Sequence, residues 1–215
     1  MIHTNIADIR RDYSHKSLSE QDADKNPIQQ FAKWWDEAIH SKIDEVNAMT
    51  LATSSPDGLP SARVVLLKGV NENGFVFFTN YESYKGRQLA ENPKACLVFF
   101  WKELERQVRI TGLVLKVSAA ESDEYFNSRP EASRIGAWAS PQSRVIEDRH
   151  WLDEKFNELV NKMEGTSIQR PSYWGGYLVK PVEIEFWQGR PSRLHDRIQY
   201  TLQDDGAWKI ERLAP

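Results

Sequence analysis

Short apolar runs separated by tight-turn sequences are the feature that most restricts the fold of this chain. Two β-branched runs flank "SPDG" at residues 55–58, and "NENG" at residues 71–74 separates the second run from a third. Proline and glycine stand in these stretches where β-turns favour them. The pattern predicts three strands in a meander within residues 48–80.

The rest of the chain alternates between strand and helix patterns. Further strands are predicted at residues 94–102, 106–118, 176–189, 196–203 and 207–213. Apolar residues at helical spacing predict helices at residues 27–46, 83–93, 118–129 and 150–163. The third of these should stop or kink at Pro130, because proline disrupts a helix interior. The fold class is therefore α+β and mainly antiparallel β, as a barrel or sandwich with peripheral helices.

Residues 1–26 are polar and show no sustained period, so they are interpreted as a mobile N-terminal arm. Residues 27–215 are interpreted as a single domain, a length that one hydrophobic core can serve.

Composition excludes several classes of function. The net charge of −3 argues against a nucleic-acid-binding protein, and no strand combines basic and aromatic residues on one face. One cysteine, Cys96, rules out an intrachain disulfide and is interpreted as a buried thiol, and no cysteine or histidine cluster has metal-ligand spacing. The chain has neither an apolar signal segment nor a run long enough to span a membrane, so a cytoplasmic location is expected.

The stretch "WQGRPSRLHDR", residues 187–197, concentrates three arginines and a histidine in eleven residues. If the chain is extended after the "RPS" turn, Arg193, His195 and Arg197 lie on one face. Burying such a face would require a partner, because unpaired charges are costly away from water. A solvated face or ion pairs with Asp196 are the alternatives.

Three other stretches combine cations with hydroxyl groups or aromatic rings. Thr79, Ser83, Lys85 and Arg87 stand at a strand-to-helix junction, where a helix start favours an anion. In a second stretch, Arg63 and Lys68 bracket an aliphatic strand and should face opposite sides of it. In a third stretch, Tyr125, Arg129 and Ser133 follow one another at intervals of four residues. An ordinary helix cap, a strand ending in lysine and a charged surface are the alternatives. Together the stretches predict a site for more than one phosphate-bearing small molecule, and no nucleophile motif or P-loop is present.

Eight motifs in order along the chain resemble one family. They are "RVVLLKG", "FFTNYES-K", "LERQVRITG", "SRP-ASRIGAW-S-QS", "YWGG", "IEFWQG", "RLHDR" and the terminal "W-I-RLAP". The pattern resembles the pyridoxine/pyridoxamine 5′-phosphate oxidases from about Arg10 to Pro215.

The resemblance implies an FMN-binding split β-barrel that acts as a homodimer, with FMN at the subunit interface. It implies oxidation of pyridoxamine or pyridoxine 5′-phosphate to pyridoxal 5′-phosphate, with hydride transfer to FMN and reoxidation by dioxygen, which gives hydrogen peroxide. By motif, the residues implied to bind FMN are Arg63, Val64, Val65, Leu66, Leu67, Lys68, Phe78, Thr79, Tyr84, Lys85, Gln107, Gln142, Ser143, Trp187 and Arg197.

The same resemblance assigns the substrate site. The implied residues are Arg10, Arg11, Asp12, Tyr13, Lys68, Tyr125, Arg129, Ser133, Arg193, Leu194 and His195. Among these, Arg193 and His195 are the expected catalytic pair, and residues 10–13 resemble an arm that closes over the substrate. The alternative for this arm is a solvated charged turn. Arg190 matches no family position and is interpreted as a surface residue.

The chain departs from the family at Tyr84, where the family often has an arginine that reaches the FMN phosphate. A tyrosine donates one hydrogen bond and brings no charge, and Arg87 is close enough in sequence to compensate.

Three rival functions were weighed. A flavin-binding split barrel with another redox role would lack the substrate motifs, and a carrier of pyridoxal phosphate would need no flavin. A nucleic-acid-binding barrel is disfavoured by the net charge.

Overall fold

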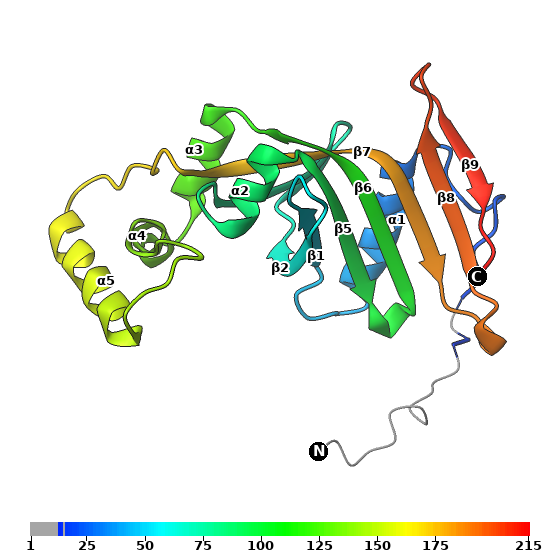
Figure 1. Cartoon of the computed structure of the whole chain (residues 1–215). Coiled ribbons are helices and arrows are strands. Elements are labelled where there is room, and N and C mark those ends of the chain that lie inside the picture. The colour runs from blue at the N-terminus through cyan, green and yellow to red at the C-terminus, as the bar shows by residue number, and fades with distance from the viewer. Residues whose placement is uncertain (1–12, 15) are drawn as a thin grey trace, which may run out of the picture. The chain divides into compact units, whose positions relative to one another are not determined.

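The computed structural model describes residues 13, 14 and 16–215, and most of them belong to strands or helices (Figure 1). The strands are β1 (Ala48–Ser54), β2 (Pro60–Leu66), β3 (Gly69–Asn71), β4 (Gly74–Asn80), β5 (Lys94–Trp101), β6 (Arg106–Lys116), β7 (Trp174–Gln188), β8 (Asp196–Leu202) and β9 (Trp208–Arg212). The helices are α1 (Pro27–His40), α2 (Tyr84–Glu91), α3 (Ala119–Ser128), α4 (Glu131–Ala139) and α5 (Arg149–Met163).

The strands form hydrogen-bonded ladders in the order β2-β1-β5-β6-β7-β4-β3, with β8 on β7 and β9 on β8. The ladder of β4 with β7 is antiparallel and pairs Phe75 with Val179 and Asn80 with Trp174. The ladder of β7 with β8 is also antiparallel and pairs Trp187 with Arg197. These ladders and the solved structures described below confirm the prediction of a mainly antiparallel split barrel with helices.

The chain separates into two compact units. The first contains the described residues up to Met49 together with 97–111 and 182–215, and the second contains 50–96 and 112–181. Strands β1, β5, β6 and β7 contribute residues to both units. The predictions of a mobile arm over residues 1–26 and of one domain from residue 27 stay predictions.

Aromatic packing forms the core of the first unit. Phe31 and Trp34 of α1 contact Phe99, Trp101 and Phe186 at ring centroid distances of 5.2–6.0 Å. Helix α1 begins where Asn26 accepts a hydrogen bond from the Ile28 N–H, which satisfies one of the free donors of its first turn.

In the second unit, the predicted break at Pro130 is confirmed. Helix α3 ends at Ser128, and α4 begins at Glu131 after Pro130, whose backbone is extended. Beneath the two helices lies a cluster of Phe126, Ile135, Ile168 and Trp174. Helices α4 and α5 pack against each other (Figure 1). The break matters because it makes two short helices in place of one long one, and Phe126 of α3 and Ile135 of α4 both join this cluster.

No helix among the residues that the structure describes is long and apolar enough to cross a membrane.

Candidate phosphate-binding site

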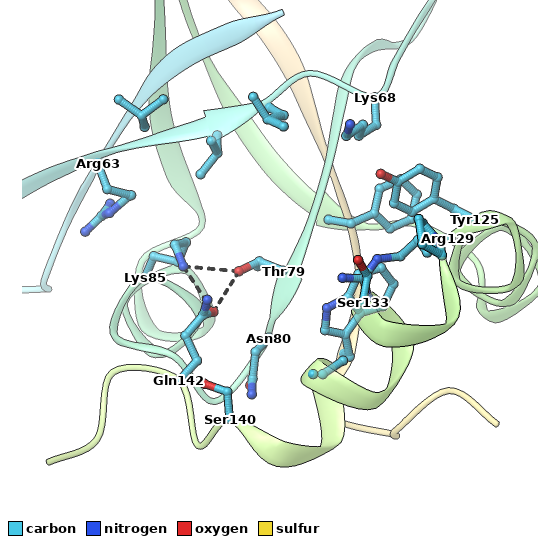
Figure 2. A pocket seen from close by; sticks show the side chains of 18 residues that line it. Arg63, Lys68, Thr79, Asn80, Lys85, Tyr125, Arg129, Ser133, Ser140 and Gln142 are labelled. Atoms are coloured by element: carbon cyan, nitrogen blue, oxygen red, sulfur yellow. Dashed lines mark hydrogen bonds between the residues drawn. The ribbon is translucent and has the colours of Figure 1, made fainter. Parts of the chain in front are cut away.

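The second unit contains a cavity of about 710 Å³ that is lined by residues of β2, β4, β7, α2, α3 and α4 and of the loops beside them. Figure 2 shows its side chains, with Arg63 and Lys85 toward one side and Lys68, Tyr125, Arg129 and Ser133 toward the other. Twelve residues implied by the family resemblance line it: Arg63, Val64, Val65, Leu66, Lys68, Phe78, Thr79, Lys85, Tyr125, Arg129, Ser133 and Gln142.

Lys85 is buried at the start of α2, where Ser83 caps the helix by accepting a hydrogen bond from the Gly86 N–H. The Lys85 ammonium donates to Thr79 Oγ1 at 3.1 Å and to Gln142 Oε1 at 3.3 Å (Figure 2). Burial, together with the smaller effect of the nearby charge of Arg63, lowers the pKa of Lys85 to about 8. No described carboxylate pairs with this ammonium, so an anionic ligand would supply its missing counter-charge.

Arg63 is a second cation of the same kind. Its guanidinium donates to the hydroxyls of Thr53 and Ser61, both at 2.6 Å. Burial lowers the pKa of Arg63 from its ordinary value. Arg63 and Lys85 therefore form one cationic end of the cavity, held by neutral side chains.

Arg129 and Lys68 form the other cationic end. The Arg129 guanidinium lies 4.6 Å from the Trp174 ring, and its Nη1 is buried without a hydrogen-bond partner among the described residues. Burial lowers the pKa of Arg129. The Lys68 ammonium lies 6.0 Å from the Tyr125 ring. An unpartnered buried guanidinium nitrogen is costly, and a phosphate oxygen would satisfy it.

Aromatic rings line the cavity at the end that holds Arg129 and Lys68. Phe78 stacks on Tyr125 at 4.0 Å and on Trp174 at 5.6 Å.

The prediction that Arg63 and Lys68 face opposite sides is wrong, since both line this cavity. Strand β2 ends at Leu66, so strand alternation does not extend to Lys68. Cations at both ends of a cavity that is also lined by aromatic and aliphatic side chains suit planar ligands that carry phosphates.

Three implied residues of this unit do not line the cavity. Leu67 is buried, Tyr84 is exposed, and Ser143 lies in the loop after α4 with a φ of 70°. Arg87 does not line it either: its guanidinium donates to Glu82 O and lies 5.9 Å from the Tyr84 ring. The expected compensation by Arg87 therefore has no support in this geometry.

The cavity also includes residues that the sequence reasoning missed: Asn80, Pro130, Gly136, Ala137, Ser140 and Trp174. Asn80 and Pro130 directly adjoin the predicted Thr79 and Arg129, which was the available signal for these two residues.

A second group of implied residues lies in the first unit. The His195 ring lies 4.6 Å from the Trp187 ring, and the Tyr13 ring meets both edge-on, at 5.7 Å from Trp187 and 5.9 Å from His195. Gly189 leaves room for this packing, because a Cβ there would lie 2.7 Å from Tyr13 Cγ. Residues 10–12 of the predicted arm lie outside the described residues.

The protonation of His195 follows from its hydrogen bond. The Arg190 backbone N–H donates to His195 Nδ1 at 3.1 Å, so the neutral ring carries its hydrogen on Nε2. Burial and the charge of Arg193 both lower the pKa of His195, which favours this neutral form. The Arg190 side chain is partly exposed, and its Nε lies 3.7 Å from Asp196 Oδ2, so its interpretation as a surface residue stays a prediction.

The idea that Arg193, His195 and Arg197 share one strand face also fails. Residues Pro191–Arg193 form a 3₁₀ turn in which Ser192 and Arg193 have φ values of 56° and 62°, and β8 begins only at Asp196. Arg193 and Leu194 are exposed after this turn. Arg197 instead donates to the buried Glu185 carboxylate at 2.7 Å. Gln107 lies on β6.

Fold and site together define a class: a split barrel with a cavity for phosphorylated planar molecules. A family model described as pyridoxamine 5′-phosphate oxidase matches residues 35–162, and one described as the pyridoxine 5′-phosphate oxidase C-terminal dimerisation region matches residues 174–215. The chain belongs to the pyridoxine/pyridoxamine 5′-phosphate oxidase family.

Relatives cover nearly the whole chain. It is 59% identical over 210 residues to a pyridoxine/pyridoxamine 5′-phosphate oxidase of Trichormus variabilis, which covers 98% of both chains. It is 58% identical over 212 residues to pyridoxine/pyridoxamine 5′-phosphate oxidase 1 of Ralstonia nicotianae, over 99% of this chain and 100% of the relative.

Among solved structures, PhzG of Burkholderia lata, in complex with tetrahydrophenazine-1-carboxylic acid, matches with a TM-score of 0.86 and 32% identity over 92% of this chain and 98% of that one. A pyridoxamine 5′-phosphate oxidase-related, FMN-binding protein of Nostoc punctiforme matches with a TM-score of 0.69 at 18% identity, over 86% and 97%, and shows the fold alone.

Proposed function

We propose that this chain oxidises pyridoxamine 5′-phosphate and pyridoxine 5′-phosphate to pyridoxal 5′-phosphate, with FMN as cofactor and dioxygen as final electron acceptor. The observation that carries the proposal is the cavity with cations at both ends, the buried Lys85 and half-buried Arg63 at one and the half-buried Arg129 at the other, and no described carboxylate paired to any of these three. Two phosphate-bearing molecules, a cofactor and a substrate, would supply the missing anions. The curated relatives carry the same activity in their names.

FMN suits the donors present. Lys85 and Arg63 would hold its phosphate, with Thr79 and Gln142 beside them, and Val64 to Leu66 would line its ring. When bound, FMN supplies a ring that accepts a hydride from the substrate. At the other end, Arg129, Lys68, Tyr125 and Ser133 would hold the substrate phosphate.

The first-unit residues complete the proposal. Arg193 and His195 would orient the substrate ring, and His195 would offer its Nε2–H as a donor. Trp187, Arg197 and Gln107 would contact FMN, and Tyr13 would close over the substrate with Arg10, Arg11 and Asp12. Tyr84, Leu67 and Ser143 remain proposed FMN neighbours.

We also propose a homodimer, supported by the match of residues 174–215 to a C-terminal dimerisation region. FMN would lie at the subunit interface, and the cytoplasmic location stays a prediction.

The test is formation of pyridoxal 5′-phosphate from pyridoxamine 5′-phosphate in air by the purified protein supplied with FMN. We expect product that depends on both FMN and oxygen. Arg129→Ala should impair the reaction at low substrate, whereas Arg134→Ala changes a nearby arginine that does not line the cavity and serves as the matched control. A protein that binds FMN but forms no product would favour the rival flavoprotein function.

A further inference from the structure

Arg63 is oriented by two hydroxyl groups. Its Nη1 donates to Thr53 Oγ1 and its Nη2 donates to Ser61 Oγ, each at 2.6 Å, and Nη1 also lies 3.2 Å from Leu51 O. A guanidinium can only donate hydrogen bonds, so both hydroxyls must accept from it. Each hydroxyl then has its own hydrogen free to donate elsewhere.

Gln88 receives both of those hydrogens. Its Oε1 lies 2.6 Å from Thr53 Oγ1 and 2.6 Å from Ser61 Oγ, and an amide oxygen has two lone pairs to accept them. The hydrogen bonds from Arg63 through Thr53 and Ser61 to Gln88 therefore have one consistent set of directions, and the two hydroxyls also lie 3.4 Å from each other, where either could donate. The buried Gln88 Nε2 has no partner among the described residues, so the two hydroxyl bonds alone account for the orientation of this amide.

The network joins three elements of the second unit. Thr53 lies near the end of β1, and Ser61 and Arg63 lie two apart on β2, which places them on one face. Gln88 comes from α2, three residues after Lys85, so both side chains lie on the same side of this helix. One short helix thus delivers the Lys85 ammonium to the cavity and holds the partners of the second cation.

The electrostatic charge of the groups in this network determines whether Arg63 can bind an anionic ligand. Every group that holds Arg63 is neutral, so its positive charge is not offset by a carboxylate. A carboxylate in the place of the Gln88 amide would accept the same hydroxyl hydrogens and would also attract the guanidinium, in competition with a ligand phosphate. Because neutral groups orient Arg63, its guanidinium is held in place while its positive charge remains available to a ligand phosphate.

We propose that Gln88, acting through Thr53 and Ser61, is a positioning residue that aims Arg63 at the FMN phosphate and so lets the protein discriminate FMN from riboflavin. The inference rests on the proposed function, because it takes FMN as the ligand of this cavity.

The experiment compares the dissociation constants of FMN and riboflavin, measured by flavin fluorescence titration of the purified apoprotein. The variants are Gln88→Glu, which keeps the shape and adds a charge, and Gln88→Met, which removes the acceptor. We expect FMN to bind about 10- to 100-fold more weakly in both, as for loss of a charge-assisted contact, with riboflavin changed by less than about threefold.

Asn92→Asp is the matched control. It makes the same amide-to-carboxylate change at the end of the same helix, where Asn92 contacts Ser54 and not Arg63. It should leave the ratio of the two constants unchanged. If a Gln88 variant fails to fold, Ser61→Ala removes one hydroxyl and should weaken FMN selectively by about three- to tenfold.

An unchanged ratio in the folded variants would overturn the proposal, and so would an equal loss of both ligands, which would mean a merely structural role. If Asn92→Asp changed the ratio of the two dissociation constants as much as Gln88→Glu does, the proposal would be overturned as well. If the unaltered protein does not bind FMN, the proposed function itself fails, which the wild-type titration shows separately.

Discussion

Protonation of Lys85 should set the upper pH limit of FMN binding. Burial, and to a smaller extent the charge of Arg63, lowers the pKa of this ammonium to about 8. A bound phosphate would stabilise the ammonium and raise its pKa again. Above pH 8 binding must therefore take up a proton, and FMN affinity should fall as pH rises.

The size of the effect follows from that pKa. When one proton is taken up, affinity falls about tenfold for each pH unit above 8, so the dissociation constant should increase roughly tenfold between pH 7 and pH 9. The phosphate of FMN does not obscure this slope, because a phosphate monoester loses its second proton near pH 6, roughly one unit below this range.

The assay is fluorescence titration of the apoprotein with FMN, and in parallel with riboflavin, from pH 7 to pH 9. Riboflavin lacks the phosphate and should show no such slope. Lys85→Arg should bind FMN with little pH dependence, because a guanidinium stays charged throughout this range. A flat profile in the unaltered protein, or the same slope in Lys85→Arg, would refute the reasoning.

Three further substitutions test the remaining roles. Arg129→Ala should raise KM for both substrates about 10- to 100-fold with a much smaller change in kcat, because it removes a phosphate contact; steady-state kinetics that show a fall in kcat alone would contradict this. Arg193→Ala should chiefly lower kcat by misorienting the substrate, and near-normal turnover would remove Arg193 from the catalytic set. Tyr84→Arg should tighten FMN about tenfold and leave riboflavin unchanged, because it adds a charge-assisted bond near Arg63. Equal FMN constants for Tyr84→Arg and the parent would show that position 84 does not face the phosphate.

Local signals were sufficient for most of the secondary structure. The turn sequences at residues 55–58 and 71–74 join β1 to β2 and β3 to β4, and Pro130 separates α3 from α4. These features depend on backbone preferences of single residues, which sequence reveals directly. The predicted meander of three strands is wrong, because the second run breaks at residues 67–68 into β2 and β3, and β4 pairs with β7 and β3 instead of β2. The cationic residues of the cavity were also predictable as anion-binding candidates, but their meeting at one cavity came from the family resemblance.

The turn before β8 was not predictable in the same way. Ser192 and Arg193 adopt positive φ values that usually favour glycine or asparagine, so an extended chain was the natural expectation.

The hydrogen-bond network from Arg63 to Gln88 was missed for a different reason. Its members come from β1, β2 and α2, and each residue alone is an ordinary polar side chain. Only the spacing of Ser61 and Arg63 by two hinted at a shared face.

The buried cations of the cavity also have a consequence for the stability of the whole unit. Lys85 and Arg63 repel each other, and the described residues around them offer no carboxylate to relieve the repulsion. A ligand that binds only the folded state stabilises it by mass action, by about 2.7 kcal/mol at a free concentration 100 times its dissociation constant. FMN should therefore raise the unfolding temperature of this protein in a concentration-dependent way, and riboflavin at the same concentration should raise it less. The concentration of FMN would then determine how much of the protein stays folded, as well as how much of it is active.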